Sequence, residues 1–194
     1  MSSAAIRSTT LADALIPGTG VARDLLLTVG GTALTAAAAQ VTIPWHPVPF
    51  TLQTLSVMLC GLSLGWRRGG LSQLLYLAAG AAGVPVFASF SAGFHVFGGA
   101  TAGYLITYPF VAALLGWLAE KNWTKSILGT AAAMVIGDGI ILLCGASWLS
   151  MFIGWKGAIQ HGIAPFVVAE IVKAAVVTGL LPSVWKVTRD SGAI

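Results

Sequence analysis

Residues 161–182 read HGIAPFVVAEIVKAAVVTGLLP, and this stretch decides the fold. It is apolar enough to lie in a lipid bilayer, yet it contains an acid, Glu170, and a base, Lys173. A spacing of three residues puts both side chains on one face of a helix. Placing either charge in the centre of a bilayer costs roughly 2–3 kcal/mol or more. The pair is therefore predicted to face a protein-lined cavity, with this helix as one wall of a membrane-embedded pocket.

The composition of the whole chain agrees with a membrane protein. Its 194 residues are 57% hydrophobic and 8% charged, and the mean hydropathy is +0.89, whereas soluble domains carry about 25% charged residues. The length suits one compact domain. The net charge of +4 comes from cations that lie between hydrophobic segments, which favours membrane topology over nucleic-acid binding. No signal peptide is expected, and Cys60 and Cys144 are expected to be small apolar residues rather than a disulfide.

The hydrophobic pattern predicts an all-α integral membrane protein with six transmembrane helices. Their expected ranges are 25–41, 51–64, 71–84, 101–118, 126–143 and 163–181. In this interpretation residues 25–189 form one membrane domain, residues 1–24 a cytoplasmic lead-in and residues 190–194 a tail. A short interfacial helix is expected near residues 11–15. Some of the six helices have fewer than the roughly 20 residues that cross a bilayer comfortably.

Glycine and proline indicate where these helices end. Residues 65–70 are expected to form the turn after the second helix, and residues 148–162 a loop before the last one. Three prolines make residues 42–50, TIPWHPVPF, a constrained non-helical loop. The Gly-Asp-Gly run at 137–139 is expected to interrupt the fifth helix. Trp185, with the cations that follow it, is expected to anchor the last helix at the membrane interface.

Six membrane crossings place both termini on the same side of the bilayer. Eight of the ten cations fall on that side: Arg7, Arg23, Arg67, Arg68, Lys121, Lys125, Lys186 and Arg189. The opposite loops contain only Lys156. Because Lys and Arg accumulate in cytoplasmic loops, both termini are predicted to be cytoplasmic.

Polar groups converge at one depth of this predicted bundle. The last helix runs inward, so at about 1.5 Å per residue Glu170 and Lys173 lie roughly 10–15 Å below its outer end. Asp138, on the fifth helix, is expected near the same depth. The loops at 42–50 and 85–99 lie above them, which indicates an outward-opening pocket with a lid. Two alternatives stay open: a purely structural ion pair for Glu170 and Lys173, and close helix packing around a protonated Asp138.

The remaining side chains give no sign of catalysis. Five aromatic residues of the outer loops either cover an apolar ligand or form an interfacial belt: Trp45, Phe87, Phe90, Phe94 and Phe97. Phe87 is the preferred ligand contact because it follows the fixed Pro85. His46, His95 and His161 have no partner at i+4, so no metal site is expected. The sequence has neither a phosphate-binding G-x-x-x-x-G-K-[ST] loop nor a G-x-S-x-G turn, so no enzyme is expected.

The first predicted helix has small residues four apart. Gly31, Thr35 and Ala39 form one such row, and Ala33 and Ala37 form another. Rows of this kind let a second helix approach closely within lipid. They indicate either packing inside the bundle or an outward docking face.

Several blocks along nearly the whole chain resemble the BioY family, the biotin-binding S components of energy-coupling-factor (ECF) vitamin transporters. The blocks occur in the family order: TLADALIP, AAQVTIPWHPVPFTLQT, LGWRRG, LLYLAAGAAGVPVFA, GGATAGYL and PFVVAEIVKAA. The chain departs from the family pattern at Ala102 and Ala169, where glycine is usual, and at Glu170, where aspartate is usual. Asp138 replaces a usual amide. These changes are expected to alter the pocket volume.

The resemblance implies a six-helix S component that captures biotin at the outer face of a bacterial cytoplasmic membrane. It implies a membrane T component and a pair of ABC ATPases as partners, with no cofactor. The expected biotin contacts are Gln53, Phe87, Ser89, Thr101, Tyr104, Asp138, Glu170 and Lys173. Of these, Phe87 and Asp138 are predicted from the sequence pattern and not from the resemblance. The expected lid contains Trp45, His46, Pro47 and Val48, and the expected docking face contains Ala33 and Ala37.

The chemistry of biotin suits the predicted pair. Glu170 is expected to accept from the ureido N–H groups, and Lys173 to donate to the ureido carbonyl or to pair with the carboxylate. In the preferred pose both residues contact the ureido ring, and the carboxylate tail lies nearer the lid. Nanomolar capture needs about 12 kcal/mol, which favours a closed lid over an open groove. Two other functions remain open: a self-sufficient channel or secondary transporter, and a structural membrane subunit without a ligand.

Overall fold

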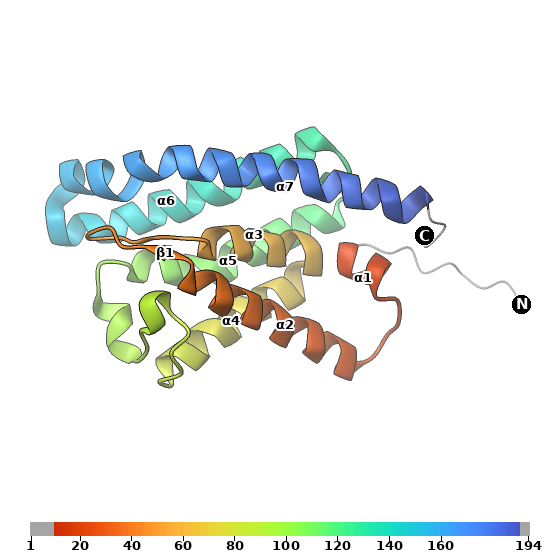
Figure 1. Ribbon diagram of the computed structural model, residues 1–194, viewed down its shortest axis with the longest axis horizontal. Coiled ribbons are helices and arrows are strands. Elements are labelled where there is room, and N and C mark those ends of the chain that lie inside the picture. The colour runs from red at the N-terminus through yellow and green to blue at the C-terminus, as the bar shows by residue number, and fades with distance from the viewer. Residues whose placement is uncertain (1–9, 191–194) are drawn as a thin grey trace, which may run out of the picture.

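The computed structural model describes residues 10–190, so Arg7 and the predicted tail beyond residue 190 lie outside the described residues. This part of the chain is a helical bundle (Figure 1). Its α-helices are α1 (Leu11–Leu15), α2 (Val21–Gln40), α3 (Gln53–Leu64), α4 (Trp66–Ala81), α5 (Ala102–Glu120), α6 (Ile127–Ala158) and α7 (Ala164–Asp190). The six predicted membrane helices correspond to α2–α7, and α1 is the short helix expected in the lead-in.

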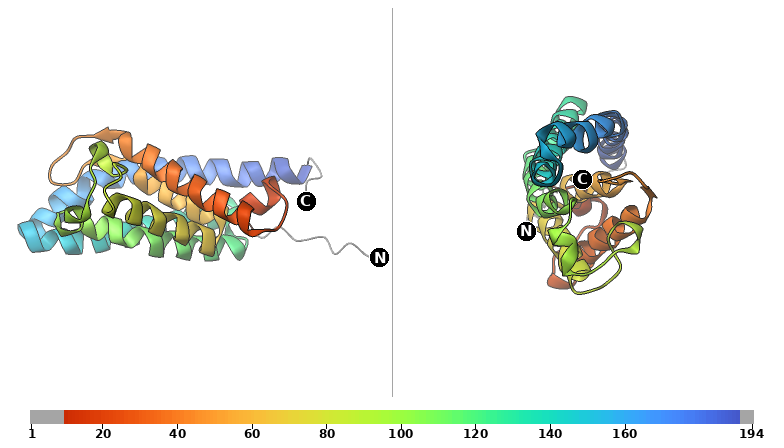
Figure 2. Two further views of the ribbon diagram at one scale, coloured as in Figure 1. Left: turned by 90° about the horizontal axis from the view of Figure 1, so that it is seen from below. Right: turned by 90° about the vertical axis from the view of Figure 1, so that its left-hand side faces the viewer.

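Helix α5 lies at the centre of the bundle. Together with α3 it lies between the pair α6–α7 on one side and the pair α2–α4 on the other (Figure 1; end-on in Figure 2). In α5, 72% of the most apolar stretch is buried within the bundle, against 17% in α2. Among residues 10–190, three stretches are long and apolar enough to cross a membrane: Val21–Gln40, Ala102–Glu120 and Ile127–Thr188. Large apolar side chains on their outer faces are exposed, as contact with lipid requires.

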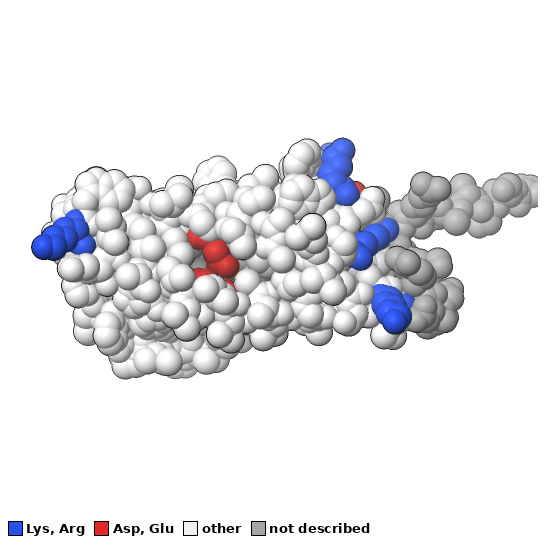
Figure 3. Space-filling model, turned by 90° about the horizontal axis from the view of Figure 1, so that it is seen from above, with Lys and Arg blue, Asp and Glu red and all other residues white. Residues whose placement is uncertain are grey.

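The two ends of the bundle differ. Helix α1 and the C-terminal end of α7 lie at one end, and a two-stranded hairpin, β1 (Thr42–Ile43) and β2 (Phe50–Thr51), lies toward the other (Figure 1). On the face drawn in Figure 3, basic side chains lie at the two ends, and acidic atoms appear midway along an otherwise uncharged surface. This distribution matches a bundle with polar ends and an apolar middle.

The break between α3 and α4 is a single residue. Gly65 has φ +86°, a left-handed conformation that glycine adopts without strain. The backbone N–H of Trp66 donates to Glu120 Oε1 at 3.1 Å, which caps the start of α4. Arg67 and Arg68 therefore lie in the first turn of α4. The predicted turn over residues 65–70 was wrong because one glycine suffices to reverse the chain here.

Helix α6 corrects two further predictions. It passes through Asp138 and its flanking glycines without a break. A Cβ on Gly137 would crowd Leu115 of α5, so this glycine serves close helix packing. The break falls instead at Gly154, whose φ is +69°, and is followed by the π-helical turn η4 (Ile159–Ile163). The loop predicted over residues 148–162 is therefore largely helical.

Trp185 does not anchor the chain at a membrane surface. Its side chain is 1% exposed, and its Nε1–H donates to Thr124 Oγ1 at 3.1 Å. Lys125 lies 4.7 Å from the ring centroid. Trp185 thus fastens the end of α7 to the 3₁₀ turn η3 (Trp123–Lys125). An indole beside basic residues is common both at interfaces and over buried contacts, and sequence does not separate the two cases.

The two rows of small residues on α2 face different ways. Gly31, Thr35 and Ala39 are buried, and a Cβ on Gly31 would meet Ser72 of α4 at 3.0 Å. Ala33 and Ala37 are exposed. Of the two interpretations left open, internal packing applies to the first row, and the second row remains free for an external contact.

Ion pairs hold helix α1 against one end of the bundle. Asp13 pairs with Arg23 at 3.0 Å and with Arg68 at 2.8 Å, and Arg68 also reaches Asp24 at 3.3 Å. Thr10 caps the helix, because its hydroxyl accepts from the N–H of Asp13. Leu11, Ala12 and Ala14 are buried beneath. These contacts join α1 to the start of α2 and of α4.

We expect this cluster to make stability depend on acid. Burial raises the pKa of Asp13, but hydrogen bonds from Thr10, Arg68 and Arg23 outweigh it, so the pKa lies below the ordinary 3.8. The carboxylate therefore stabilises the fold above about pH 4, and this contribution is lost as the pH falls through the lower folded-state pKa. Asp13→Asn is expected to lower the free energy of unfolding by about 1–2 kcal/mol at neutral pH. It is also expected to weaken the dependence of that free energy on pH in the acid range.

The measurement is unfolding in detergent between about pH 3 and pH 7. Asp24→Asn is the matched control, since the Asp24 side chain is 56% exposed and such pairs contribute about 0–1 kcal/mol. Acid profiles that coincide for Asp13→Asn and the parent protein would contradict the assignment.

Candidate functional site

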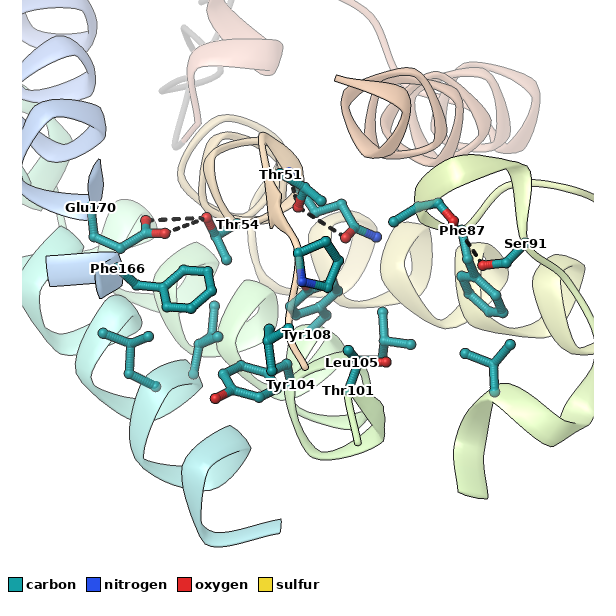
Figure 4. A pocket seen from close by; sticks show the side chains of 17 residues that line it. Thr51, Thr54, Phe87, Ser91, Thr101, Tyr104, Leu105, Tyr108, Phe166 and Glu170 are labelled. Atoms are coloured by element: carbon teal, nitrogen blue, oxygen red, sulfur yellow. Dashed lines mark hydrogen bonds between the residues drawn. The ribbon is translucent and has the colours of Figure 1, made fainter. Parts of the chain in front are cut away.

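A cavity opens between the hairpin and the helices beside it. Its walls come from the hairpin, the start of α3, the segment between α4 and α5, and helices α5, α6 and α7 (Figure 4). The lining residues are Val48, Pro49, Thr51, Gln53, Thr54, Phe87, Ala88, Ser91, Val96, Thr101, Tyr104, Leu105, Tyr108, Ile141, Leu142, Phe166 and Glu170. The walls are thus mostly apolar with a few convergent polar groups, as in small-molecule sites.

The free space within the cavity is small. Its unfilled space amounts to about 620 Å³ with the opening to the exterior included, but the centres of water molecules can occupy only about 70 Å³ of it. Since one water needs roughly 10–15 Å³ on that measure, a few waters fit. A bicyclic ligand would therefore require one wall to move.

The polar end of the cavity is a buried ion pair. Lys173 Nζ lies 2.8 Å from Glu170 Oε1, with the two side chains 11% and 5% exposed. The ammonium also donates to Thr54 Oγ1 at 2.8 Å and to the carbonyl of Thr51 at 2.9 Å. Thr54 in turn donates to the Glu170 carboxylate at 3.1 Å. The pair thus ties α7 to the second hairpin strand and to α3.

Glu170 keeps hydrogen-bonding capacity that Lys173 lacks. An ammonium has three donors and a carboxylate about four acceptor positions. All three donors of Lys173 have partners, whereas Glu170 accepts from Lys173 and Thr54 and also interacts with the neighbouring Asp138 carboxyl. Glu170 lines the cavity and Lys173 does not. The group that the site presents to a ligand is therefore a fixed carboxylate, which suits an N–H donor.

A second polar network fixes the floor below the hairpin. Gln53, 5% exposed, donates to the hydroxyl of Tyr76 and accepts from Thr51 Oγ1 at 3.0 Å. Tyr76 donates on to the carbonyl of Val86 at 3.2 Å. The Gln53 amide is thereby oriented, and the hairpin, α3 and α4 are joined around it.

Phe87 forms the wall on the α4 side. Its ring is 2% exposed and lies edge-on to Tyr76, with the centroids 5.4 Å apart. Gln40 of α2 donates to the Phe87 carbonyl at 3.2 Å and accepts from the N–H of Phe90 at 3.0 Å. The ring lies directly over Gly80, where any Cβ would overlap it.

Gly80→Ala is therefore expected to force Phe87 out of place and to destabilise the fold by about 1–3 kcal/mol. The matched control is Gly139→Ala, because a Cβ at Gly139 has no other atom within 4 Å. Thermal unfolding in detergent compares the two variants. Equal stability of both variants would show that Phe87 does not need the space above Gly80.

Aromatic rings join the hairpin to α7 beside the cavity. Phe50 stacks on Phe166 of α7 at 4.3 Å, and Trp45 lies edge-on to Phe50 at 6.0 Å. Val48 reaches the cavity, whereas Trp45 is 45% exposed on its outer side. His46 and Pro47 line a separate hollow together with His161. Of the four predicted lid residues, only Val48 touches the cavity.

The structure brings together most of the predicted contact residues. Gln53, Phe87, Thr101, Tyr104 and Glu170 line the cavity. Three others do not: Lys173 lies behind Glu170, Asp138 lies beside it, and Ser89 is exposed with φ +56°. The neighbouring Ser91 lines the cavity in place of Ser89.

Asp138 is a buried carboxyl close to the ion pair. It is 7% exposed, and its Oδ1 has no hydrogen-bond partner among the described residues. Its electrostatic neighbours are Glu170 and Lys173. Within the described part of the chain no cluster of three or more His, Cys, Asp or Glu could hold a metal ion. The acids of this region are therefore arranged around one lysine.

The sequence interpretation missed Thr54, Ser91, Tyr108 and Phe166 as lining residues. Two of them had a usable signal. Phe166 lies one turn before Glu170, and Tyr108 one turn after Tyr104, so each shares a helix face with a predicted contact. Ser91 had no such signal, because the path of its loop depends on tertiary contacts.

This architecture, a helical membrane bundle around an enclosed pocket with a buried charge pair, defines a small-ligand-binding membrane protein. A family model described as the BioY family matches residues 7–190. The chain belongs to the BioY family, and it is a multi-pass membrane protein. This confirms the resemblance seen in the sequence blocks.

Known proteins similar to this chain carry corresponding names. The "Probable biotin transporter BioY" of Pyrococcus horikoshii is 39% identical over 155 residues, covering 79% of this chain and 91% of that protein. The "Biotin transporter BioY" of Thermotoga maritima is 40% identical over 146 residues, covering 75% and 85%. A crystal structure described as the S-component for biotin from an ECF-type ABC transporter superposes with a TM-score of 0.76 at 24% identity, covering 87% of this chain and 95% of that one. That similarity establishes the fold.

Proposed function

We propose that this protein is the biotin-binding S component of an ECF-type importer. The observation that carries the proposal is the enclosed cavity with a fixed Glu170 carboxylate, found in a chain of the BioY family. Biotin offers two ureido N–H donors, which match a carboxylate acceptor, and an apolar bicyclic ring, which matches walls such as Phe87 and Phe166. Relatives named as biotin transporters support the choice of ligand.

In this proposal the chain crosses a bacterial cytoplasmic membrane six times with both termini inside. The cations at the ends of α4, α5 and α7 favour that orientation. Biotin enters from outside, and the hairpin acts as the lid, since the cavity without ligand is too small for a bicyclic molecule. The exposed Ala33 and Ala37 face is where a membrane T component docks, and a pair of ABC ATPases supplies the energy.

Equilibrium binding of labelled biotin to the purified protein tests the proposal. We expect saturable binding with a dissociation constant in the nanomolar range, which corresponds to about −12 kcal/mol. Unlabelled biotin should compete, whereas riboflavin, thiamine and folate should not. Equal competition by these vitamins, or no binding of biotin, would reject the function.

Reconstitution tests the partnership separately. We expect no biotin transport in liposomes that contain this chain alone, and transport after the T component and the ATPase pair are added. ATP-independent transport by the chain alone would indicate a secondary transporter or a channel.

A further inference from the structure

The charge of the cavity wall limits how a ligand carboxylate can be held. Within residues 10–190, Glu170 is the only charged side chain that lines the cavity, and no Lys, Arg or His does so. An anionic group bound inside would therefore meet a carboxylate and no cation. Burying an ion without a charge partner is costly, because the protein interior replaces its hydration poorly.

Lys173 is the nearest cation, but it is fully engaged. Its three donors reach Glu170, Thr54 and the Thr51 carbonyl at 2.8–2.9 Å. Pairing Lys173 with a ligand carboxylate would require at least one of these bonds to break. If the bond to Glu170 broke, a second carboxylate would be left buried without its partner. The pair is thus arranged to hold Glu170 for a neutral N–H donor.

The opposite side of the cavity is neutral. Figure 4 places Ser91 and Phe87 across the cavity from Glu170 and Thr54. Val96 and Thr101 are further uncharged residues of the cavity lining. His95 of the same loop is exposed and is not part of the lining. Ser91 is exposed, and its hydroxyl already donates to the carbonyl of Ala88 at 2.8 Å. This side is therefore an uncharged, solvent-exposed edge, which does not distinguish a charged tail from an uncharged one.

We propose that the site recognises the ureido ring of biotin at Glu170 and leaves the carboxyl group without a charge partner on the Ser91 side. The ligand class then includes biotin whose carboxyl group is blocked as an ester or an amide, as in biotin attached to an amine. This inference depends on the proposed function and narrows it, because it assigns specificity to the ring alone.

Competition against labelled biotin tests the inference on the whole purified chain. Biotin methyl ester and biotinamide are expected to compete within tenfold of biotin itself, whereas biotin alkylated on a ureido nitrogen is expected to compete at least 100-fold less well. A loss of more than tenfold for both the ester and the amide would overturn the inference and leave the proposed function intact. Failure of biotin itself to bind would overturn both.

A charge added on the tail side gives a second readout. Ser91→Lys places a cation at the lining, and Ser89→Lys places the same charge in the same loop outside it. The ratio of ester to acid dissociation constants is expected to rise at least fivefold in Ser91→Lys and to stay unchanged in Ser89→Lys. An unchanged ratio in Ser91→Lys would show that the carboxyl group lies elsewhere and would overturn the proposal.

Discussion

Lys173→Ala is expected to weaken biotin binding by about 100-fold or more. Within residues 10–190 Lys173 is the only cation bound to Glu170, so the variant leaves a buried carboxylate without its charge partner, a loss that typically costs 3–5 kcal/mol. It also frees Thr54 and the Thr51 carbonyl, so the hydrogen bond between α7 and the hairpin is lost. Titration of labelled biotin into the purified variant in detergent gives the dissociation constant.

Two controls separate binding from folding in this experiment. The double variant Glu170→Gln and Lys173→Met removes both charges, and such a replacement is often neutral for stability; it should recover the unfolding temperature without recovering binding. Lys156→Ala removes an exposed lysine near the C-terminal end of α6 and should bind as the parent does. If Lys173→Ala binds biotin as tightly as the parent, the site is wrongly assigned.

Ala37→Trp is expected to abolish uptake while leaving biotin binding unchanged. Ala37 is exposed on α2, on the turn after Ala33 and away from the cavity lining. A bulky ring there would prevent close approach of a partner helix, which depends on small residues in lipid. Uptake of labelled biotin in cells that express the whole importer should fall at least tenfold.

The control for this substitution is Val135→Trp, which adds similar bulk on an exposed face of α6. It should leave both uptake and binding unchanged. A parallel loss of binding and uptake in Ala37→Trp would indicate that Ala37 supports the bundle rather than a partner. Uptake losses of the same size in both variants would indicate a general membrane effect.

Hydrophobic periodicity was sufficient to predict the helices that correspond to α2–α7, but local residue preferences misplaced two breaks. The Gly-Asp-Gly run in α6 is a helix-breaking pattern in water, yet within the bundle it lies against α5 and stays helical. Gly154 has no more distinctive sequence signal than the other glycines. It breaks α6 because the chain must reverse there to run back along the bundle. The position of that reversal depends on contacts distant in sequence.

The candidate site was predictable where charged residues are rare in an apolar segment and lie close together in the sequence. A Glu and a Lys three residues apart in an apolar helix predict a pair that avoids lipid, and the pair lies beside a cavity. The hydrogen-bond partners of Lys173 were not predictable, because one of them, the Thr51 carbonyl, belongs to a hairpin that is distant in sequence. Ser91 was missed for a related reason: packing of Phe87 on Gly80 and the bonds from Gln40 set the path of its loop.

The buried Trp185 side chain holds one end of α7 in place, and this affects how the helix can move. The C-terminal end of α7 is held by an indole with 1% exposure, bonded to Thr124, whereas its N-terminal end continues from a π-helical turn beyond a non-helical glycine. A helix that is fixed at one end moves mostly at its other end. Spin labels just before the N-terminal end of α7, for example at exposed Gln160 of η4, should therefore report displacement when ligand binds, while labels near Trp185 should report none.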